Sequence, residues 1–413
     1  MASKAKKPDF KHANLDPGLA QKIITCGGAA AVVGIGGAAG LSAGHWDAFF
    51  HAYMIAYAYF LAIALGGLFF VILNHLVRAG WSVVFRRLAE GVASTLPVMG
   101  VLLLPVVISV LMGNHDLFEW NDPVLAEKDH LIHHKHAYLN ATFFAVRFVI
   151  YFGFWALAAR YFLSNSLKQD ETGDHKISTK MERFAAPGMF AFALTLTFAA
   201  FDYIMSLQPH WFSTIFGVYY FAAANVSFLA VTILICRWLQ SKDARTLPGL
   251  NVEHYHDIGK LLFGFNFFWS YIAFSQFMLI WYANIPEETE WYLERQEGGM
   301  AMVSLALLLG HFAIPFLGLI SRRAKRNLKV LTFWSVWLLV AHFIDMFYLI
   351  SPAQGGHGGE HAAGAVHFGP ANILAFVGIG GAFAAALAFV LRGKKLIPIK
   401  DPRLSESLGF HNV

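Results

Sequence analysis

Five ionisable side chains lie inside apolar stretches of this sequence and could carry acid–base chemistry. They are Arg147, Asp202, His311, His342 and Asp345. An ionised side chain at the centre of a membrane helix costs about 2.5–3.5 kcal/mol on insertion scales, so each of these residues needs a compensating role. Carboxylate and imidazole groups exchange protons near neutral pH, which makes a proton route one interpretation. In the alternative, an Arg–Asp pair and a His–Asp pair neutralise each other and fix helix packing.

A second group of polar side chains falls at a similar depth in neighbouring apolar stretches. Their hydroxyl, amide and imidazole groups could hydrogen-bond the head group of a quinol, and they are our candidates for a quinol pocket: His51, Tyr53, Tyr57, Ser275 and Gln276. His311 and His342 could instead ligate a b-type haem. Bulky neighbours such as Phe343 oppose that alternative, because facing imidazoles need small residues around the haem ring.

The composition describes a chain with too few charged residues for a water-exposed surface. Of its 413 residues, 57% are hydrophobic and only 14% are charged, against about 25% charged in soluble domains. This balance excludes a nucleic-acid binder, a secreted disulfide scaffold and a soluble enzyme. Cys26 and Cys236 form no ligand motif, which excludes covalent c-type haem, iron–sulfur clusters and thiolate zinc sites from this chain.

Apolar runs of about twenty residues, each long enough to cross a bilayer, predict an all-α polytopic membrane protein with ten transmembrane helices. The expected spans are residues 23–43, 49–74, 91–112, 139–161, 185–207, 213–236, 259–283, 299–320, 329–351 and 371–391. Lys and Arg are concentrated in the tails at residues 1–22 and 392–413 and in every second loop. Because cytoplasmic loops carry this excess, both tails are expected in the cytoplasm. The basic run at residues 322–326 would then anchor the chain to anionic lipid.

The loops on the opposite side are acidic and rich in histidine, and the two long ones leave room to dock an outside partner. Their histidines lack the cysteine or carboxylate spacing of a metal site. We therefore expect solvated side chains at His130, His133, His134, His136, His357, His361 and His367.

Spans two to nine read as two copies of one four-helix unit, at residues 49–207 and 213–351. In each copy an aspartate precedes a proline by seven residues near the end of the fourth helix. The matching positions are Asp202 and Pro209 against Asp345 and Pro352, and Arg147 against His311. Each unit has an even number of spans, so the copies would point the same way, as a parallel repeat.

The spans at residues 23–43 and 371–391 flank the two units. The first of them carries small-residue spacing at Gly34, Gly36, Gly37 and Gly40. Such spacing favours close approach of two helices. The second helix of this contact could belong to the same chain or to a partner.

The run FDYIMSLQPHWFSTIFGVY at residues 201–219 resembles the ten-span membrane subunits of bacterial alternative complex III, in the NrfD/PsrC-like family. The chain length and the C-terminal segment, with DPRL at residues 401–404 and HNV at residues 411–413, are also similar. The resemblance implies two four-helix bundles flanked by one helix at each end. It also implies a place in a quinol:electron-acceptor oxidoreductase of the bacterial cytoplasmic membrane.

The resemblance further implies that redox cofactors lie in partner subunits and that this chain binds none itself. The implied partners are a periplasmic iron–sulfur subunit, multihaem and monohaem cytochrome c subunits, a sibling ten-span subunit that oxidises most of the quinol, and a terminal oxidase. This chain would contribute a proton route or a bundle that binds menaquinol or another quinol. The alternatives are an ion-coupled transporter and a purely structural anchor.

Overall fold

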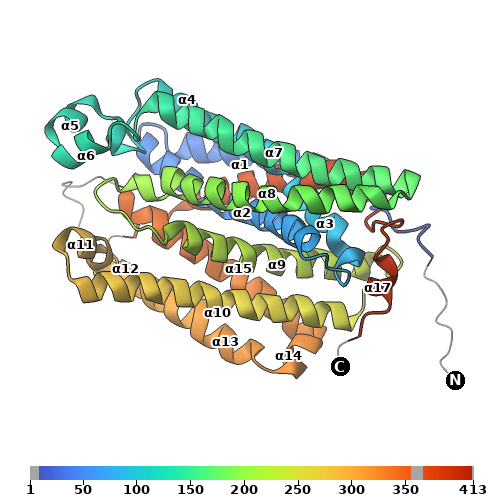
Figure 1. The fold of residues 1–413 in the computed structure, drawn as a ribbon. Helices are drawn as coiled ribbons and strands as arrows, with labels where there is room; N and C mark the ends of the chain where they lie inside the picture. The colour runs from blue at the N-terminus through green and yellow to red at the C-terminus, as the bar shows by residue number, and fades with distance from the viewer. Residues whose placement is uncertain (1–8, 355–365, 412–413) are drawn as a thin grey trace.

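The computed structural model describes residues 9–354 and 366–411, and these residues form helices and turns with no β-strand beyond one isolated bridge. Ten helical segments are long and apolar enough to cross a membrane, as predicted, and they run side by side (Figure 1). The chain is therefore a multi-pass membrane protein. The predicted loop histidines His357 and His361 lie outside the described residues.

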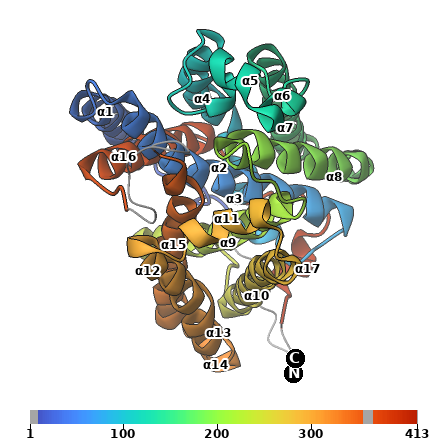
Figure 2. The same ribbon diagram turned by 90° about the vertical axis from the view of Figure 1, so that its left-hand side faces the viewer.

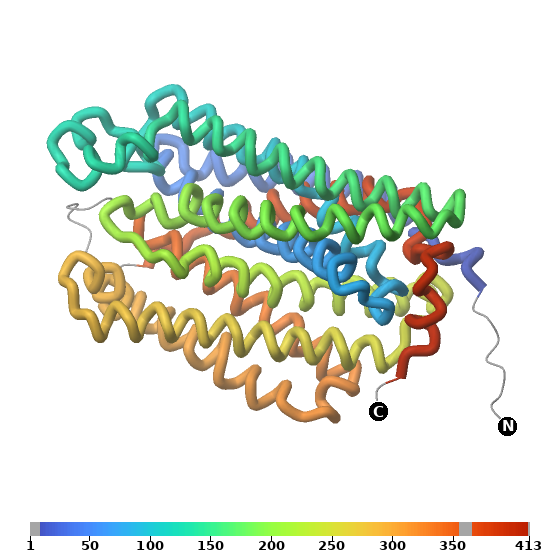
Figure 3. The backbone as a smooth tube through the Cα atoms, viewed as in Figure 1, coloured from blue at the N-terminus to red at the C-terminus, as the bar shows by residue number. Residues whose placement is uncertain are grey.

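The ten spanning segments follow one another in the predicted order, and Figure 3 traces the chain through them. Their bounds are α1 (Pro17–Leu41), α2 (Trp46–Leu76), α3 (Val83–Ala93) with α4 (Leu96–Leu111), α7 (Ala141–Thr172), α8 (His175–Tyr203), α9 (Phe216–Lys242), α10 (Val252–Ala283), α12 (Gly298–Ala306) with η3 (Leu307–Ala313) and α13 (Ile314–Leu319), α15 (Leu328–Ile350) and α16 (Pro370–Leu391). Shorter helices occupy the connections: η1 (Glu119–Asn121), α5 (Pro123–Lys128), α6 (His130–Lys135), η2 (Met205–Leu207), α11 (Pro286–Glu294), α14 (Arg322–Arg326), η4 (Ser351–Ala353) and α17 (Leu404–Leu408).

The third span begins eight residues before the predicted start at residue 91, and it is broken between α3 and α4. The hydroxyls of Ser94 and Thr95 each donate to a backbone carbonyl of the preceding turn, at 2.7 Å. Pro97 has no N–H to continue the helical ladder. Side-chain bonds of this kind compete with helical ones, which explains the break. The early turns of α3 carry charged side chains, so the apolar run that predicts the third span begins only after them.

The eighth span, predicted as one helix, contains the π-helical segment η3 between α12 and α13. Pro315 lacks the N–H that would continue the hydrogen-bond ladder. The freed carbonyl of Gly310 accepts the indole N–H of Trp337 on α15, at 2.6 Å. Wide turns of this type recur at functional sites. This one carries His311.

The centre of the molecule is made by α2 and α9, which pack against each other and against helices from both halves of the chain. Figure 2, which views the helices from one end, places α2 and α9 between the outer helices. Gly66 lets the two helices touch, because a Cβ there would lie 2.3 Å from the carbonyl oxygen of Ala224. α2 is therefore enclosed along most of its length, and most of its residues from His51 to His75 are buried.

The close contact predicted for the first span is made within the chain, by α1 against α16. A Cβ on Gly34 would lie 2.5 Å from the Cα of Gly378, so the two backbones meet at this point. Figure 2 shows the pair at one edge of the bundle. The partner-helix alternative is not needed to explain the glycine spacing.

The two terminal segments lie at the same end of the bundle. Asn14 and Lys395 form an isolated antiparallel bridge, and Leu396 N–H donates to the carbonyl of Ala13 at 2.7 Å. α17 lies at this end, whereas α5, α6 and α11 lie at the other (Figure 1). The histidines of and beside α6 are exposed, as predicted for His130, His133, His134 and His136. His367 is half-buried.

Candidate functional site

The first buried ionic centre joins α7 to α8. Arg147 Nε lies 2.7 Å from Asp202 Oδ2, and the same oxygen accepts the hydroxyl of Tyr151 at 2.8 Å. The guanidinium lies 3.9 Å from the ring centroid of Tyr138 and also donates to its carbonyl, at 2.8 Å. Both charged side chains are buried. The predicted Arg147–Asp202 pair is confirmed, and the cation compensates the carboxylate directly.

The second buried carboxylate, Asp345 on α15, has different partners. Tyr219 of α9 donates its hydroxyl to Oδ1 at 2.5 Å, and Trp269 of α10 donates its indole N–H to Oδ2 at 3.1 Å. Asp345 is fully buried. No ion pair among the described residues includes it. Asp345 is therefore held by neutral donors, without a cation.

His311 and His342 are buried near Asp345 and form no His–Asp pair with it. Neither ring nitrogen of His311 has a hydrogen-bond partner among the described residues, and the His342 imidazole lies against the backbone of Tyr59. The His311 ring packs on Trp269, with centroids 3.7 Å apart, and the His342 ring packs on Tyr59 at 4.7 Å. The pairing alternative is wrong for this half of the chain. Each imidazole also has an aromatic ring against it, which does not fit a haem held between the two.

Three of the quinol-pocket candidates serve the packing of α2. Tyr53 and Tyr57 donate to backbone carbonyls of α4, at 2.5 and 3.1 Å, and His51 Nδ1 lies 2.8 Å from the carbonyl of Asp47. Ser275, a further candidate, lies on α10 next to Gln276. None of these four residues lines the cavity that Gln276 borders.

Gln276 is the candidate that lies on a cavity. A space of about 720 Å³ lies against α10, α12 and η3, with Gln276 in its wall. The Gln276 amide donates to the Tyr292 hydroxyl and accepts from Ser213, at 3.1 Å each. Tyr219 and Trp269, the two donors to Asp345, line the same cavity. Tyr219 and Trp269 thus contact both the cavity and the Asp345 carboxylate.

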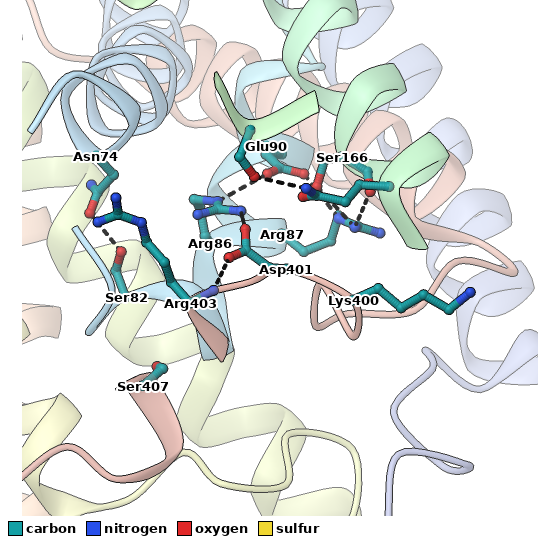
Figure 4. A network of polar contacts seen from close by, with 12 residues as sticks. Asn74, Ser82, Arg86, Arg87, Glu90, Ser166, Lys400, Asp401, Arg403 and Ser407 are labelled. Atoms are coloured by element: carbon teal, nitrogen blue, oxygen red, sulfur yellow. Dashed lines mark hydrogen bonds and ion pairs between the residues drawn. The ribbon is translucent and has the colours of Figure 1, made fainter. Parts of the chain in front are cut away.

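A buried charged network at the opposite end of the bundle was missed at the level of sequence (Figure 4). Arg87 Nε lies 2.9 Å from Glu90 Oε2, and Arg87 Nη2 lies 2.8 Å from Asp170. Arg86 pairs with Glu90 and with Asp401 of the C-terminal segment. The Arg-Arg-x-x-Glu spacing within α3 was the available signal. It predicts pairs at i,i+3 and i,i+4 on a helix.

Arg295, between α11 and α12, was also missed. It is fully buried, its guanidinium lies 3.5 Å from the Trp291 ring centroid, and it donates to Gln208 Oε1 at 3.0 Å and to the Tyr348 carbonyl at 3.1 Å. Burial lowers the pKa of Arg295 to about 10, so it remains a cation at neutral pH. A single arginine among the acidic residues at positions 286–297 was the signal.

No model of a known protein family matches the chain, and no curated protein matches it. Of the two carboxylates, Asp202 is locked in an ion pair, whereas Asp345 is hydrogen-bonded by neutral groups next to a cavity. The second arrangement is the one suited to proton exchange.

Proposed function

We propose that the chain is a membrane subunit of a quinol:electron-acceptor oxidoreductase in the bacterial cytoplasmic membrane, and that it contributes a proton-exchange site. It would take the place of the F-type subunit of alternative complex III. The resemblance of residues 201–219 and the ten spanning helices support this role. In this proposal the segments α2–α8 and α9–α15 are parallel copies of a four-helix unit flanked by α1 and α16, and both termini are cytoplasmic.

The observation that carries the proton role is the set of neutral donors around Asp345. A proton added to Asp202 would leave the buried Arg147 cation without its partner, which is costly. A proton added to Asp345 separates no ion pair, because Tyr219 and Trp269 are uncharged. Asp345 can therefore gain and lose a proton at a lower free-energy cost than Asp202, because no buried ion pair is broken.

The two donors also indicate which oxygen takes the proton. An indole N–H can only donate, so Oδ2 of Asp345 must remain an acceptor opposite Trp269. The Tyr219 hydroxyl can donate to the carboxylate or accept from the carboxylic acid. The proton therefore enters at Oδ1, and Tyr219, which lines the cavity, is the group through which it arrives or leaves.

In the proposed complex the electron carriers belong to other chains. The iron–sulfur subunit, the multihaem and monohaem cytochrome c subunits and the sibling ten-span subunit would transfer the electrons, with a terminal oxidase as acceptor complex. The exposed apolar faces of this chain, such as Leu157 and Phe190 at 70% and 74% exposure, would contact lipid or the sibling subunit. The acidic connections carrying α5, α6 and α11 would face the periplasmic subunits.

The role is tested on the complex purified from its own host through a tag on this chain. We expect c-type haem bands in the reduced-minus-oxidised spectrum, from co-purifying partners. In proteoliposomes, Asp345→Asn should lower proton translocation at least about tenfold while leaving assembly intact. Asp243→Asn, which changes a carboxyl group on an exposed loop, is the matched control. A colourless isolated protein, or full coupling in Asp345→Asn, would contradict the proposal.

A further inference from the structure

A second hollow of the bundle lies along α16, away from both buried aspartates. α16 packs closely on α1 and α2. Between α16 and the helices α9 and α15 a space of about 430 Å³ remains, which we call the α16 groove. Ile235 and Leu387 line it and are only half-buried, so the groove is open at the surface that meets lipid in a membrane.

The α16 groove is long and apolar. Phe376 and Leu391 mark its extent along α16, and at a rise of about 1.5 Å per residue this stretch is about 22 Å long. Phe60 of α2 belongs to its wall, with its ring centroid 5.1 Å from that of Phe376. One leaflet contributes about 15 Å of hydrocarbon, half of the bilayer core. The groove can therefore hold one acyl chain along its whole length.

The end of the groove near the chain termini lies at the membrane surface. Leu15 and Leu396, from the two terminal segments, line this end. Trp238 of α9 lines the groove as well and is 38% exposed. Tryptophan is enriched at the membrane–water interface, because its ring is apolar and its N–H is polar. A lipid whose chain fills the groove would place its head group at this end.

Three helices carry a cation to the same end. Lys242 lies four residues after Trp238, so it extends the groove-lining face of α9 by one helical turn. Lys22 directly precedes Ile23, a lining residue of α1, and Arg392 is the C-cap of α16. All three cationic side chains belong to exposed residues.

These three cations lack a carboxylate partner. No ion pair among the described residues includes Lys22, Lys242 or Arg392. The carboxylates nearest to them in sequence are engaged elsewhere, since Asp16 accepts a backbone N–H of α1 at 2.7 Å and Asp243 pairs with an arginine of its own loop. Unpaired cations beside a membrane surface attract anionic lipid.

We propose that the α16 groove binds an anionic phospholipid, with one acyl chain along α16 and the phosphate among Lys22, Lys242 and Arg392. The lipid belongs to the leaflet on the side of both termini. Its two parts match the two parts of the site, since the groove is apolar along its length and cationic at one end. The inference is independent of the proposed function, because it involves no electron or proton transfer.

The test uses the full chain, alone or in the complex that it forms, in nanodiscs with a phosphatidylglycerol that carries a photoreactive acyl chain. Mass spectrometry then maps the labelled peptides. We expect label on α9 and α16, and competition by unlabelled phosphatidylglycerol about tenfold stronger than by phosphatidylcholine. Ala384→Trp fills the groove from its wall and should reduce the label about tenfold or more. Ala193→Trp, at an exposed position of α8, should leave it unchanged.

The double variant Lys22→Gln/Lys242→Gln tests the head-group end and keeps the apolar walls. It should lower the preference for phosphatidylglycerol about tenfold, and it tests the site even if Ala384→Trp fails to fold. Lys168→Gln, at an exposed position near the end of α7, is the matched control and should keep the preference. Equal competition by the two lipids in the parent protein would overturn the anionic site. Label confined to helices that do not line the groove would overturn the whole proposal.

Discussion

At the scale of single residues, the two buried aspartates show how the partner decides the chemistry of a carboxyl group. Asp202 Oδ2 lies 2.7 Å from Arg147 Nε, so the arginine compensates the negative charge of the carboxylate. Protonation of Asp202 would leave this buried cation unpaired, which makes Asp202 poorly suited to exchange protons. Asp345 receives one hydroxyl and one indole N–H, so either protonation state can be accommodated. Two residues that the sequence places at matching positions therefore have different partners, a cation for Asp202 and neutral donors for Asp345.

Arg147 provides a test of the packing role. Arg147→Met leaves the Asp202 carboxylate buried without its cation, and removing one partner of a buried pair costs about 3–5 kcal/mol. We expect a lower Tm and a lower yield of the purified protein. The double variant Arg147→Met/Asp202→Asn should recover most of this loss, because neither charge remains. Equal losses in the single and double variants, measured by thermal unfolding in detergent, would contradict a stabilising ion pair.

At the scale of elements, the break in the third span and the π-helical turn in the eighth each have a local cause. Ser94, Thr95 and Pro97 break the third span, and Pro315 accompanies the π-helical turn that carries His311. The packing of α1 is equally specific. It depends on Gly34 facing Gly378 on α16, where the two backbones meet.

Gly34 and Gly36 form a matched pair of positions on α1. An isoleucine at Gly34 would force α1 away from α16, and overpacking of this kind costs about 1–3 kcal/mol. An isoleucine at Gly36 meets no atom within 4 Å at its Cβ and should leave stability unchanged. We expect Gly34→Ile to lower the Tm in detergent and Gly36→Ile to match the parent protein. The reverse order would show that α1 packs through its other face.

At the scale of the whole molecule, the C-terminal segment ties together parts of the chain that are distant in sequence. Asp401 pairs with Arg86 of α3. Ser407 accepts the backbone N–H of Val84, and its carbonyl lies 3.0 Å from Nε2 of His254 on α10. This segment therefore contacts the first and second halves of the helical bundle at once (Figure 4 shows its contacts with α3).

Asp401→Ala is expected to loosen both halves. It leaves the buried Arg86 with Glu90 as its remaining carboxylate, and the loss of one buried partner costs about 3–5 kcal/mol. Hydrogen exchange should become faster in α3 and in the first turns of α10. Ser405→Ala, at an exposed position of the same segment, is the control. Faster exchange in α3 with an unchanged α10 would show that the segment secures only the first half.

The sequence by itself determined the ten spanning helices and the Arg147–Asp202 pair. Runs of apolar residues are local, and their length against the bilayer decides which segments cross it. Arg147 and Asp202 lie on consecutive antiparallel helices, so their heights followed from the spans alone. Composition also showed that the chain carries no cysteine motif for a metal or covalent haem.

Only the tertiary structure decided the partners of Asp345, the burial of Arg86, Arg87 and Glu90, and the helix that covers α1. Each depends on segments far apart in the chain, since Tyr219 and Trp269 come from α9 and α10, and Asp401 reaches α3 from the C-terminus. Sequence spacing describes one face of one helix. The position of that face relative to another helix is set by the packing of all the helices together, and that packing creates the cavity beside Asp345.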